Sequence, residues 1–351
     1  MRGALRDLWT WFADTQCRAY SPVYEQVCRA VARSDEVLEL VQGSPPQAHL
    51  PTVLLASVHY LLLSGLDHPL ADVYAGRSDQ DPGPLFVDVV LGHREEILGL
   101  LGTRHTNTNE VGRSAVLGPA LTEVAARLGP PLALVDVGCS AGLTLLCDRY
   151  LIDYGAAGST GPADAPVRLE CEVTGGDPPI ASRLPAVTAR VGLDRDPVDL
   201  RDDDAVRWQL ACVWPDTGRL ERTRTSLALA RDAGLDIHVG DAVDALPDLL
   251  ASLPRSGVPV VITSWALAYL PTDRRTEFVD VLRTASADRA VAWISAEGEG
   301  TVPLLADVSA PTDNQGIDAS VLGLAVFDGR DVAAEVLGFV HPHGRWLDWR
   351  A

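Results

Sequence analysis

The stretch that decides the fold is Leu132–Leu143, which reads L-A-L-V-D-V-G-C-S-A-G-L. A hydrophobic run ends at Val137, glycines follow at Gly138 and Gly142, and an apolar segment comes next. This order is typical of a buried parallel strand, a tight turn that needs small residues, and a helix. Such a turn brings backbone N–H groups up to a ligand, and the carboxylate of Asp136 is placed to meet a cationic or hydroxylated part of that ligand.

Bulk composition narrows the class of protein. The chain has 351 residues, of which 47% are apolar and 22% charged, enough for a substantial core in one large domain or two. A formal net charge of −19 without a basic patch argues against nucleic acid and against a membrane surface as partners. Lysine is absent from the sequence, which excludes Schiff-base chemistry and a Walker A loop.

Cysteine usage and apolar segments predict a soluble cytoplasmic protein. The six cysteines include no C-x-x-C pair, as expected for reduced thiols rather than for a disulfide scaffold or a zinc site. The N-terminal residues lack the apolar core of a signal peptide. The longest apolar stretch, Val53–Leu66, is too short to span a bilayer and predicts a buried helix.

Residues 1–105 predict a helical N-terminal cap domain. Helix starts are indicated at Ser34 and at Pro51, where the helix runs to Leu63, and Asp88–Leu101 carries apolar residues at helical spacing. No alternating strand pattern occurs before residue 130. We expect this domain to cover the mouth of a site formed by the rest of the chain.

Residues 106–351 predict a Rossmann-like domain, because strands alternate with helices there. An insertion at about 155–186, rich in Gly and Pro, contains a small hairpin strand at Val167–Val173. Apolar runs on both sides of Asp328-Gly329 predict a C-terminal antiparallel hairpin. Strands are expected at 132–137, 188–193, 236–239, 258–263, 290–294, 321–327 and 332–340, and helices at 143–150, 203–213, 220–233, 243–253 and 273–285.

Three chemistries use a glycine loop of this kind. Gly138–Gly142 fits the G-x-S-x-G nucleophile elbow of an α/β-hydrolase, with Ser140 as nucleophile and later histidines at His341 and His343. That fold needs several strands before the elbow, and the helical front supplies none. A dinucleotide fingerprint, the second possibility, needs glycines where this chain has Ser140 and Leu143.

The loop also resembles the first motif of class I (Rossmann-like) S-adenosylmethionine-dependent methyltransferases, which Asp136, Gly138, Ser140 and Gly142 match. The resemblance implies that this loop passes beneath the methionine portion of the cofactor, S-adenosylmethionine. It also implies an acid at the end of the second strand that holds the ribose hydroxyls. Asp194 occupies that place, and the insertion accounts for its unusually long separation from Asp136.

Further motifs follow in the order of that superfamily. Gly240-Asp241-Ala242, after the third strand, resembles the G-D-A whose acid and next backbone N–H flank the adenine, and the terminal hairpin matches the sixth and seventh strands. Four stretches also resemble an uncharacterised bacterial family described only as a domain of unknown function, over nearly the whole chain. They are 61–70, 108–113, 140–150 and 341–347.

The segment Thr106–Arg113, T-N-T-N-E-V-G-R, allows two interpretations. It can be a capped helix start with a glutamate in the first turn. It can instead place Asn109, Glu110 and Arg113 over the cofactor or substrate pocket. In that case Arg113 is the natural bidentate partner of a carboxylate.

Other candidate residues follow the fourth and fifth strands. Ser264, Trp265 and Tyr269 come where methyltransferases present a substrate-facing loop, although core packing explains the two aromatic residues equally well. Glu297 stands where α/β folds place ligands, but a solvated loop acid is the simpler interpretation. Near the C-terminus, His341 and His343 are structural residues or general bases, since histidine titrates near neutrality. No third ligand lies beside them, so no metal is expected.

These patterns predict an α/β fold: a Rossmann-like methyltransferase sheet of parallel strands with a C-terminal antiparallel hairpin, behind an all-helical N-terminal domain. The resemblance implies methyl transfer from S-adenosylmethionine to an oxygen or nitrogen of a small-molecule substrate. Candidate catalytic residues are His341, His343, Tyr269 and Glu110, and candidate cofactor contacts are Asn109, Arg113, Asp136, Gly138, Ser140, Gly142, Asp194, Asp241 and Ala242.

Two other functions stay open, a serine hydrolase that uses Ser140 and a non-catalytic protein that binds S-adenosylmethionine or S-adenosylhomocysteine or serves as a scaffold. The sequence specifies neither the methyl acceptor nor the oligomeric state.

Overall fold

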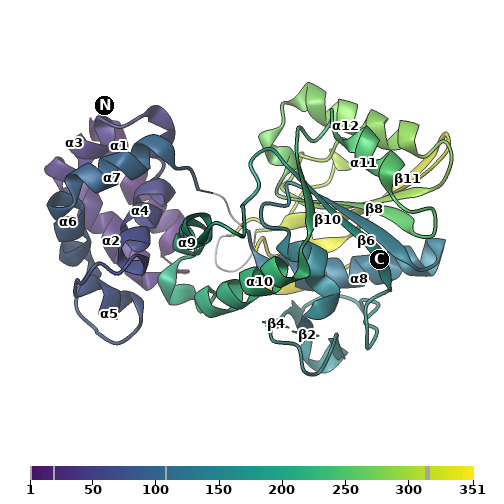
Figure 1. The fold of residues 1–351 in the computed structure, drawn as a ribbon, viewed down its shortest axis with the longest axis horizontal. Helices are drawn as coiled ribbons and strands as arrows, with labels where there is room; N and C mark the ends of the chain where they lie inside the picture. Colours follow the sequence, from purple (N-terminus) through teal and green to yellow (C-terminus); the bar gives the residue numbers. More distant parts are fainter. Residues whose placement is uncertain (1, 19, 107–108, 313–316) are drawn as a thin grey trace. The chain divides into compact units, whose positions relative to one another are not determined.

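Figure 1 shows the computed structural model of the protein, which describes residues 2–18, 20–106, 109–312 and 317–351. The chain divides into two compact units. The first comprises Met1–Thr108 and Asp199–Arg224, and the second comprises Asn109–Val198 and Thr225–Ala351. Asp199–Arg224 therefore groups with the helical residues, although the sequence places this segment between two strands of the sheet.

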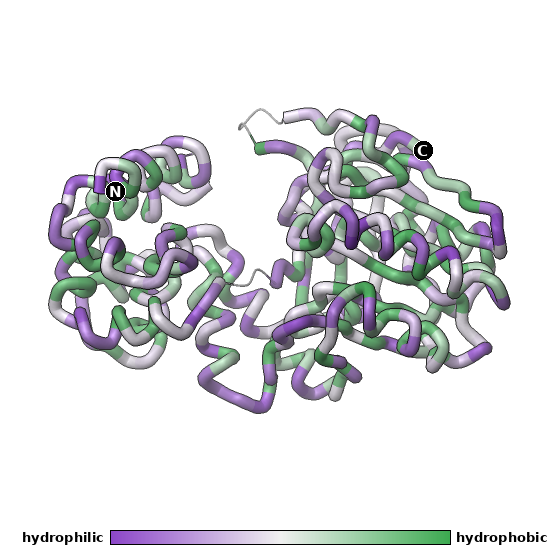
Figure 2. Tube along the Cα trace, turned by 90° about the horizontal axis from the view of Figure 1, so that it is seen from above, coloured by the Kyte–Doolittle hydropathy of each residue, from purple (hydrophilic) through white to green (hydrophobic). Residues whose placement is uncertain are grey.

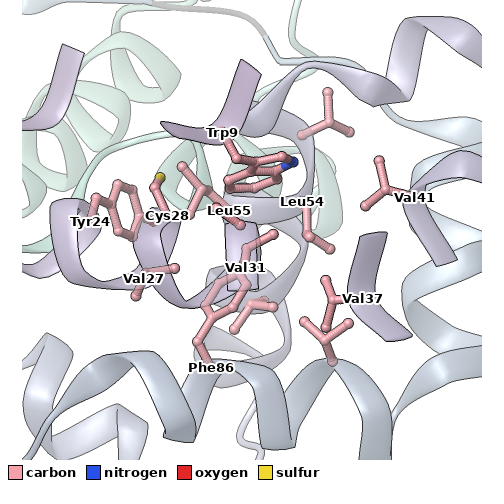
Figure 3. Close-up of a cluster of buried hydrophobic side chains, with 14 of the residues drawn as sticks. Trp9, Tyr24, Val27, Cys28, Val31, Val37, Val41, Leu54, Leu55 and Phe86 are labelled. Atoms are coloured by element: carbon pink, nitrogen blue, oxygen red, sulfur yellow. The ribbon is translucent and has the colours of Figure 1, made fainter. Parts of the chain in front are cut away.

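The first unit consists of helices around an apolar core. They are α1 (Arg2–Phe12), the π-helix η1 (Ala13–Cys17), α2 (Pro22–Arg33), α3 (Asp35–Gln42), η2 (Pro46–His49), α4 (Pro51–Leu63), α5 (Leu70–Tyr74), α6 (Pro82–Gly92), α7 (Arg94–Thr103), α9 (Asp203–Ala211) and η6 (Pro215–Thr217). Four helices begin at a side-chain cap: the side chains of Ser21, Ser34, Asp81 and Asp202 each accept a backbone N–H two or three residues later. Figure 3 shows the core, in which Trp9 and Phe86 are fully buried.

The stretch Asp88–Leu101, for which the apolar spacing predicts helix, is helical except at His93, and two helices share it. His93 leaves the helical region, with φ −118° and ψ 38°, and separates α6 from α7. Its N–H still donates to the Val89 carbonyl oxygen, while its own carbonyl oxygen accepts the Ile97 N–H. Both helices bury apolar residues in the same core, so the apolar spacing continues across the break and does not reveal it in the sequence.

Asp199–Arg224 is bound to the first unit by polar and aromatic contacts. The Asp204 carboxylate accepts hydrogen bonds from the Tyr60 hydroxyl and the Arg104 guanidinium. The rings of Trp214 and Tyr24 pack with their centroids 5.3 Å apart. The helical unit is therefore assembled from two separate stretches of the chain.

The second unit is organised around a nine-stranded sheet. Its strands are β1 (Leu132–Val137), β5 (Glu172–Val173), β6 (Val187–Asp194), β7 (Asp236–Val239), β8 (Val258–Ser264), β9 (Val291–Glu297), β10 (Ser320–Asp328), β11 (Asp331–Val340) and β12 (Trp346–Trp349). They lie in the order β5-β12-β11-β10-β9-β8-β1-β6-β7. The run from β9 to β7 is parallel, and β10 and β11 form an antiparallel hairpin beside β9. The protein is thus a mixed α/β protein with a large, mostly parallel sheet, and all seven expected strands are present.

Helices cover both faces of this sheet. In Figure 1, α11 (Leu246–Ser252) and α12 (Thr272–Ala285) lie on one side of the strands, and α8 (Ser114–Leu128) and α10 (Leu220–Ala233) on the other. Phe278 of α12 packs against Trp293 of β9, with ring centroids 5.3 Å apart. In Figure 2, hydrophobic stretches run through the part of the tube that contains the C-terminus. Every residue of β1 is buried.

Two expectations for the region after β1 need correction. The helix expected at 143–150 is a distorted 3-10 segment, η4 (Leu143–Arg149), in which Leu146 has φ −104° and ψ 17°. The residues from Leu143 to Cys147 are all buried, and the segment leaves helical geometry at Leu146.

The insertion also differs from the expected hairpin. Val167–Val173 divides into β4 (Arg168–Glu170), which pairs in parallel with β2 (Leu151–Asp153), and β5, which pairs with β12 in the large sheet. The short strand β3 (Ser159–Thr160) completes the small sheet, in the order β3-β2-β4. Partners distant in sequence therefore decide the pairing of this stretch.

Within the described residues, no helix is both long enough and apolar enough to cross a membrane.

Candidate functional site

The candidate site lies at the carboxyl ends of the parallel strands. If β1, β6, β7, β8 and β9 are numbered 1 to 5 in chain order, their order in the sheet is 3-2-1-4-5. The succession of strands therefore reverses between β1 and β8. In open α/β sheets, ligands bind outside the carboxyl ends of the strands at such a reversal. The two loops at this point are Gly138–Gly142 after β1 and the segment after β8.

The glycine loop has a left-handed backbone at three positions. The φ angles of Gly138, Ser140 and Gly142 are 78°, 53° and 71°. A side chain has no room at Gly138, because a Cβ atom there would lie 2.5 Å from the Cβ of Ala266 in the loop after β8. At Ser140 this conformation costs free energy, so the surroundings must hold it in place.

Most backbone N–H groups of the loop are bonded within the protein. Gly138 donates to the Leu193 carbonyl oxygen at 2.8 Å, and Gly142 donates within the loop at 2.7 Å. Ser140 donates to the Asp194 carboxylate at 2.8 Å. A phosphate-binding loop keeps such donors for its ligand. The loop therefore lacks the feature that makes a dinucleotide fingerprint work.

Asp194, at the end of β6, is fixed by backbone groups. Its Oδ2 accepts the Ser140 N–H, and its Oδ1 accepts the Asp196 N–H at 2.9 Å. Its carbonyl oxygen accepts the Gly240 N–H at 2.9 Å, which joins the end of β6 to the turn after β7. A carboxylate oxygen can accept two hydrogen bonds. Each oxygen thus retains acceptor capacity for hydroxyl groups of a ligand.

Asp136 is a buried acid two residues before the loop. It accepts a hydrogen bond from the Thr144 hydroxyl. Burial raises the pKa of Asp136 from 3.8 to about 6; the Thr144 hydrogen bond and Arg113 reduce this rise, and the Asp194 charge adds to it. A buried negative charge at this point favours a cationic group of a ligand and disfavours a phosphate.

The segment before α8 meets the glycine loop, although residues 107–108 of the predicted motif lie outside the described residues. Asn109 is buried, and its side-chain amide donates to the Cys139 carbonyl oxygen at 3.5 Å. Glu110 is also buried, and its Oε1 accepts the Gly112 N–H at 2.8 Å, which caps the short 3-10 helix η3 (Val111–Arg113). The capped helix start is therefore present, and it brings Asn109 to the loop at the same time.

Arg113 is partly buried and bonded to two backbone carbonyl groups. Its Nε donates to Pro342 at 3.0 Å, and its Nη1 donates to Ser264 at 2.9 Å. Burial lowers the pKa of Arg113, and the charges of Glu110 and Glu297 oppose that fall. A bidentate contact with a substrate carboxylate, as the sequence suggested, would have to replace these bonds.

Glu297 is fully buried within β9, so the solvated loop acid was the wrong interpretation. Its Oε1 accepts the N–H groups of Ala266 and Leu267 at 3.0 and 3.1 Å. Burial raises the pKa of Glu297, and these two backbone donors reduce the rise. The strand reaches this residue because β10 continues the pairing, with Val321 opposite Glu297.

The loop after β8 contains a second residue with a strained backbone. Trp265 has a φ of 55°, which is unusual for a bulky side chain. Its indole Nε1 donates to the Ser320 hydroxyl at 2.8 Å, and its backbone N–H donates to the Ala296 carbonyl oxygen at 3.1 Å. Tyr269, in the same loop, is 81% exposed, so core packing does not explain it.

Asp241 and Ala242 follow β7, beside the Gly240 that contacts Asp194. The Asp241 carboxylate accepts the Val243 N–H at 2.9 Å and a hydrogen bond from Arg274 at 2.6 Å, and it lies 3.2 Å from the Arg195 guanidinium. Burial raises its pKa, but the Val243 N–H and Arg274 outweigh this effect, and the net pKa is lowered. This carboxylate is thus bonded by backbone N–H groups and by two guanidinium groups of the protein.

His341 and His343 form a turn after β11. The His343 N–H donates to Nδ1 of His341 at 2.9 Å, and the two ring centroids are 5.5 Å apart. A Cβ atom at Gly344 would lie 1.9 Å from the Gly112 carbonyl oxygen, so this turn packs directly on η3. In the part of the chain that the structure describes, no group of three or more His, Cys, Asp or Glu residues could hold a metal ion.

The Ser140 hydroxyl is not hydrogen-bonded to a histidine. It is buried, and among the described residues it has no hydrogen-bond partner. A nucleophile elbow needs a base within hydrogen-bond reach of the serine, so the hydrolase alternative lacks its second group. The Ser264 hydroxyl, at the end of β8, is also buried and without a partner among those residues.

Sequence reasoning missed three side chains that shape the site. Thr144 binds Asp136, and Arg195 and Arg274 bind Asp241. Arg195 directly follows Asp194 in the sequence, which gave a weak signal. Arg274 lies in the first turn of α12, where acidic residues are favoured. A basic residue at such a position is unusual, and this was the sequence signal that could have identified Arg274.

A groove of about 540 Å³ lies elsewhere in the second unit. Its lining includes Val243 and Leu250 and, at the amino ends of β8 and β9, Pro259 and Val291. None of the candidate catalytic or cofactor residues lines it.

Comparison with known proteins gives the family. The profile of a family described as "Uncharacterized protein conserved in bacteria (DUF2332)" matches residues 6–349. The chain belongs to this family. The membership confirms the resemblance to an uncharacterised bacterial family and assigns no activity.

Among solved structures, one match is the bifunctional kinase-methyltransferase WbdD. It shares 13% sequence identity with this chain at a TM-score of 0.28, and the match covers 64% of this chain. It covers 42% of the WbdD chain, so this DUF2332 protein matches less than half of that length. At this TM-score the likeness carries no argument about fold or activity. No curated protein matches the chain.

Proposed function

We propose that this DUF2332 protein is an S-adenosylmethionine-dependent methyltransferase that acts on an oxygen or nitrogen of a small molecule. The observation that carries the proposal is the pair of acids at the glycine loop, where Asp194 binds the Ser140 N–H and Asp136 is buried in β1. Their negative charge suits a sulfonium group and hydroxyl donors and disfavours phosphates.

The residues of the loop fit this cofactor in part. Asp194 keeps acceptor capacity for two ribose hydroxyls, and the unpartnered Ser140 hydroxyl adds a polar group beside it. Asp241 fits less well, because Arg274 and Arg195 already neutralise its carboxylate. In the proposal Asp241 therefore shapes the turn after β7, and the neighbouring Ala242 N–H is the adenine contact.

When bound, S-adenosylmethionine supplies an electrophilic methyl group on a sulfonium centre. The task of the protein is then to align the acceptor, exclude water and receive a proton. Nδ1 of His341 already accepts the His343 N–H. Proton uptake in the proposal therefore uses Nε2 of His341 or the imidazole of His343, since histidine titrates near neutrality.

Charge balance supports one class of acceptor. Glu110, Asp136 and Glu297 are buried near the guanidinium of Arg113, whose Nε and Nη1 are bonded to carbonyl groups. A carboxylate acceptor would add a further negative charge to this group. The proposal is therefore an uncharged or cationic acceptor, such as a hydroxyl compound or an amine.

The proposal is tested by calorimetry with S-adenosylmethionine and S-adenosylhomocysteine. We expect the wild type to bind both, and Asp194→Ala to bind them on the order of 10- to 100-fold more weakly because charge-assisted hydrogen bonds are lost. Asp328→Ala, in the exposed turn between β10 and β11, is the matched control and should bind as the wild type does. If the wild type binds neither compound, the proposal is wrong.

Two further measurements separate the alternatives. Ser140→Ala would abolish a serine hydrolase, whereas a methyltransferase should lose only part of its cofactor affinity. Methyl transfer from labelled S-adenosylmethionine into any component of a bacterial small-molecule extract would exclude a purely non-catalytic role.

A further inference from the structure

The segment 264–270, called here the 264–270 loop, is held through its backbone by charged side chains. Arg113 donates to the Ser264 carbonyl oxygen at 2.9 Å, and Glu297 accepts the N–H groups of Ala266 and Leu267. The Arg113 guanidinium thus binds the start of the loop, and the Glu297 carboxylate binds its middle. The cation and the anion come from segments far apart in the sequence.

A third charged side chain holds the end of the loop. The guanidinium of Arg275, in α12, donates to the carbonyl oxygens of Leu267, Ala268 and Leu270 at 3.0, 3.2 and 2.9 Å. Charge-assisted hydrogen bonds are about twice as strong as neutral ones. Six backbone groups of one short loop are therefore fixed by charged donors and acceptors.

These contacts explain how Trp265 keeps an unfavourable conformation. Trp265, with its φ of 55°, stands between Ser264, which is bonded to Arg113, and Ala266, which is bonded to Glu297. Its indole donates to the Ser320 hydroxyl. Strained residues persist only where neighbours over-determine them, and they cluster at functional sites. The segment after β8 therefore has a backbone conformation that is fixed by hydrogen bonds and is not a flexible turn.

The loop lies at the point where a ligand is expected. Gly138 of the glycine loop has no room for a side chain because Ala266 of the 264–270 loop packs against it. Arg113 also donates to the Pro342 carbonyl oxygen, between His341 and His343. One guanidinium therefore connects the loop after β8 to the histidine turn, next to the glycine loop.

We infer that Arg113 and Glu297 are positioning residues that hold the 264–270 loop, with Trp265 and Tyr269, in the geometry that receives the methyl acceptor. Arg113 acts through the loop and the histidine turn and is not itself a clamp for substrate. That the loop receives a methyl acceptor rests on the proposed function. That Arg113 and Glu297 position the loop rests on the hydrogen bonds described above.

The chain offers a matched control at the other end of β8. The guanidinium of Arg289 donates to backbone carbonyl oxygens of the segment before β8, including Pro254 at 2.9 Å and Leu250 at 3.2 Å. Arg289 and Arg113 are both partly buried, and both bind carbonyl groups next to β8. Arg289 lies at the amino end of the sheet, where no candidate site residue is found.

The test compares Arg113→Lys, Glu297→Gln and the control Arg289→Lys by hydrogen exchange of peptides that cover 264–270. A lysine ammonium does not reproduce the fork of a guanidinium, and a neutral amide oxygen is a weaker acceptor than a carboxylate. We expect exchange of the Ala266 and Leu267 amides to accelerate on the order of tenfold in the first two variants, with no change in Arg289→Lys. This readout does not depend on methyl transfer.

The same variants are then compared by calorimetry with S-adenosylhomocysteine and by labelled-methyl transfer into a bacterial small-molecule extract. We expect the half-saturating amount of extract to rise on the order of 10- to 100-fold for Arg113→Lys and Glu297→Gln, as for a misplaced reactant. The affinity for S-adenosylhomocysteine should change less than about threefold, well below the change expected in the half-saturating amount of extract.

Each outcome decides between the two proposals. If exchange accelerates and the half-saturating amount rises while Arg289→Lys matches the wild type, the positioning role is supported. If all three variants behave alike, Arg113 and Glu297 only stabilise the fold and the inference is wrong. If the wild type binds neither S-adenosylmethionine nor S-adenosylhomocysteine, the proposed function fails, and the positioning of an acceptor fails with it, even where the exchange data show that these residues hold the loop.

Discussion

The helical unit and the sheet unit bury different kinds of side chain. The core of the helical unit is apolar and aromatic, as the cluster around Trp9 and Phe86 shows (Figure 3). The buried carboxylates of the described residues, Glu110, Asp136 and Glu297, all belong to the sheet unit. Burial of apolar surface stabilises a fold, whereas a buried carboxylate costs free energy unless it is bonded. The sheet unit therefore bears a cost in stability that the helical unit does not bear, and the proposed function assigns the chemistry to these buried acids of the sheet unit.

The largest expected effect is in the helical core. Phe86→Ala removes a fully buried ring and should lower the free energy of unfolding by about 3–5 kcal/mol through lost burial and the cavity left behind. Denaturant unfolding followed by circular dichroism measures this. Trp11→Ala, at a side chain that is 52% exposed, is the control and should cost less than about 1 kcal/mol. Equal losses for both variants would contradict an apolar core as the source of stability.

The next effect is a pH dependence in the sheet unit. The pKa of Asp136 in the folded protein is about 6, above the ordinary value of 3.8, so the folded state binds this proton more tightly. Its contribution to the free energy of unfolding is therefore fully present at low pH, falls by roughly 3 kcal/mol in all as pH rises from about 3 to about 7, and is constant above that. Asp136→Asn removes this dependence.

Unfolding of the wild type and of Asp136→Asn at pH 4 and pH 7 checks this prediction. The difference between the two proteins should shift by roughly 2 kcal/mol in favour of asparagine at the higher pH. Asp328→Asn, at an exposed turn, is the control and should show no such shift. If the difference in the free energy of unfolding between wild type and Asp136→Asn is the same at both pH values, the pKa of Asp136 is not raised in the folded protein.

The smallest effect concerns the glycine loop. Ser140 has a φ of 53°, which glycine adopts without steric cost. Ser140→Gly should therefore change the free energy of unfolding by less than about 1 kcal/mol, whereas Gly138→Ala, which meets Ala266, should lose more. Thermal unfolding of the two variants side by side measures this. A large loss for Ser140→Gly would show that the serine hydroxyl stabilises the loop.

The sequence predicted the strands of the sheet because each of them carries its own local pattern. Five apolar residues among the six of Leu132–Val137 mark β1, and Pro51 and Ser34 mark the starts of α4 and α3. The break at His93 was missed because the apolar spacing continues across it. The division of Val167–Val173 was missed because it depends on partners that are distant in the sequence.

The same distinction applies to the site. The glycine loop was found from the spacing of its glycines, and Asp194 from the methyltransferase resemblance despite its long separation from Asp136. The structure brings the two into contact through the Ser140 N–H. The role of Glu297 was missed, because its burial depends on the pairing of β9 with β10. The carbonyl contacts of Arg113 were missed as well, since nothing in a sequence shows that Ser264 and Pro342 converge on one guanidinium.

The segment Asp199–Arg224 has a consequence for how the protein can be dissected. A gene fragment that ends at residue 108 would omit Trp214, whose ring packs against Phe12, Tyr20 and Tyr24 of the helical unit. No single cut of the chain therefore separates the two units intact. An expression clone of the sheet unit alone needs an internal deletion with a short linker joining Val198 to Thr225, and a clone of the helical unit needs two coding segments fused in one reading frame.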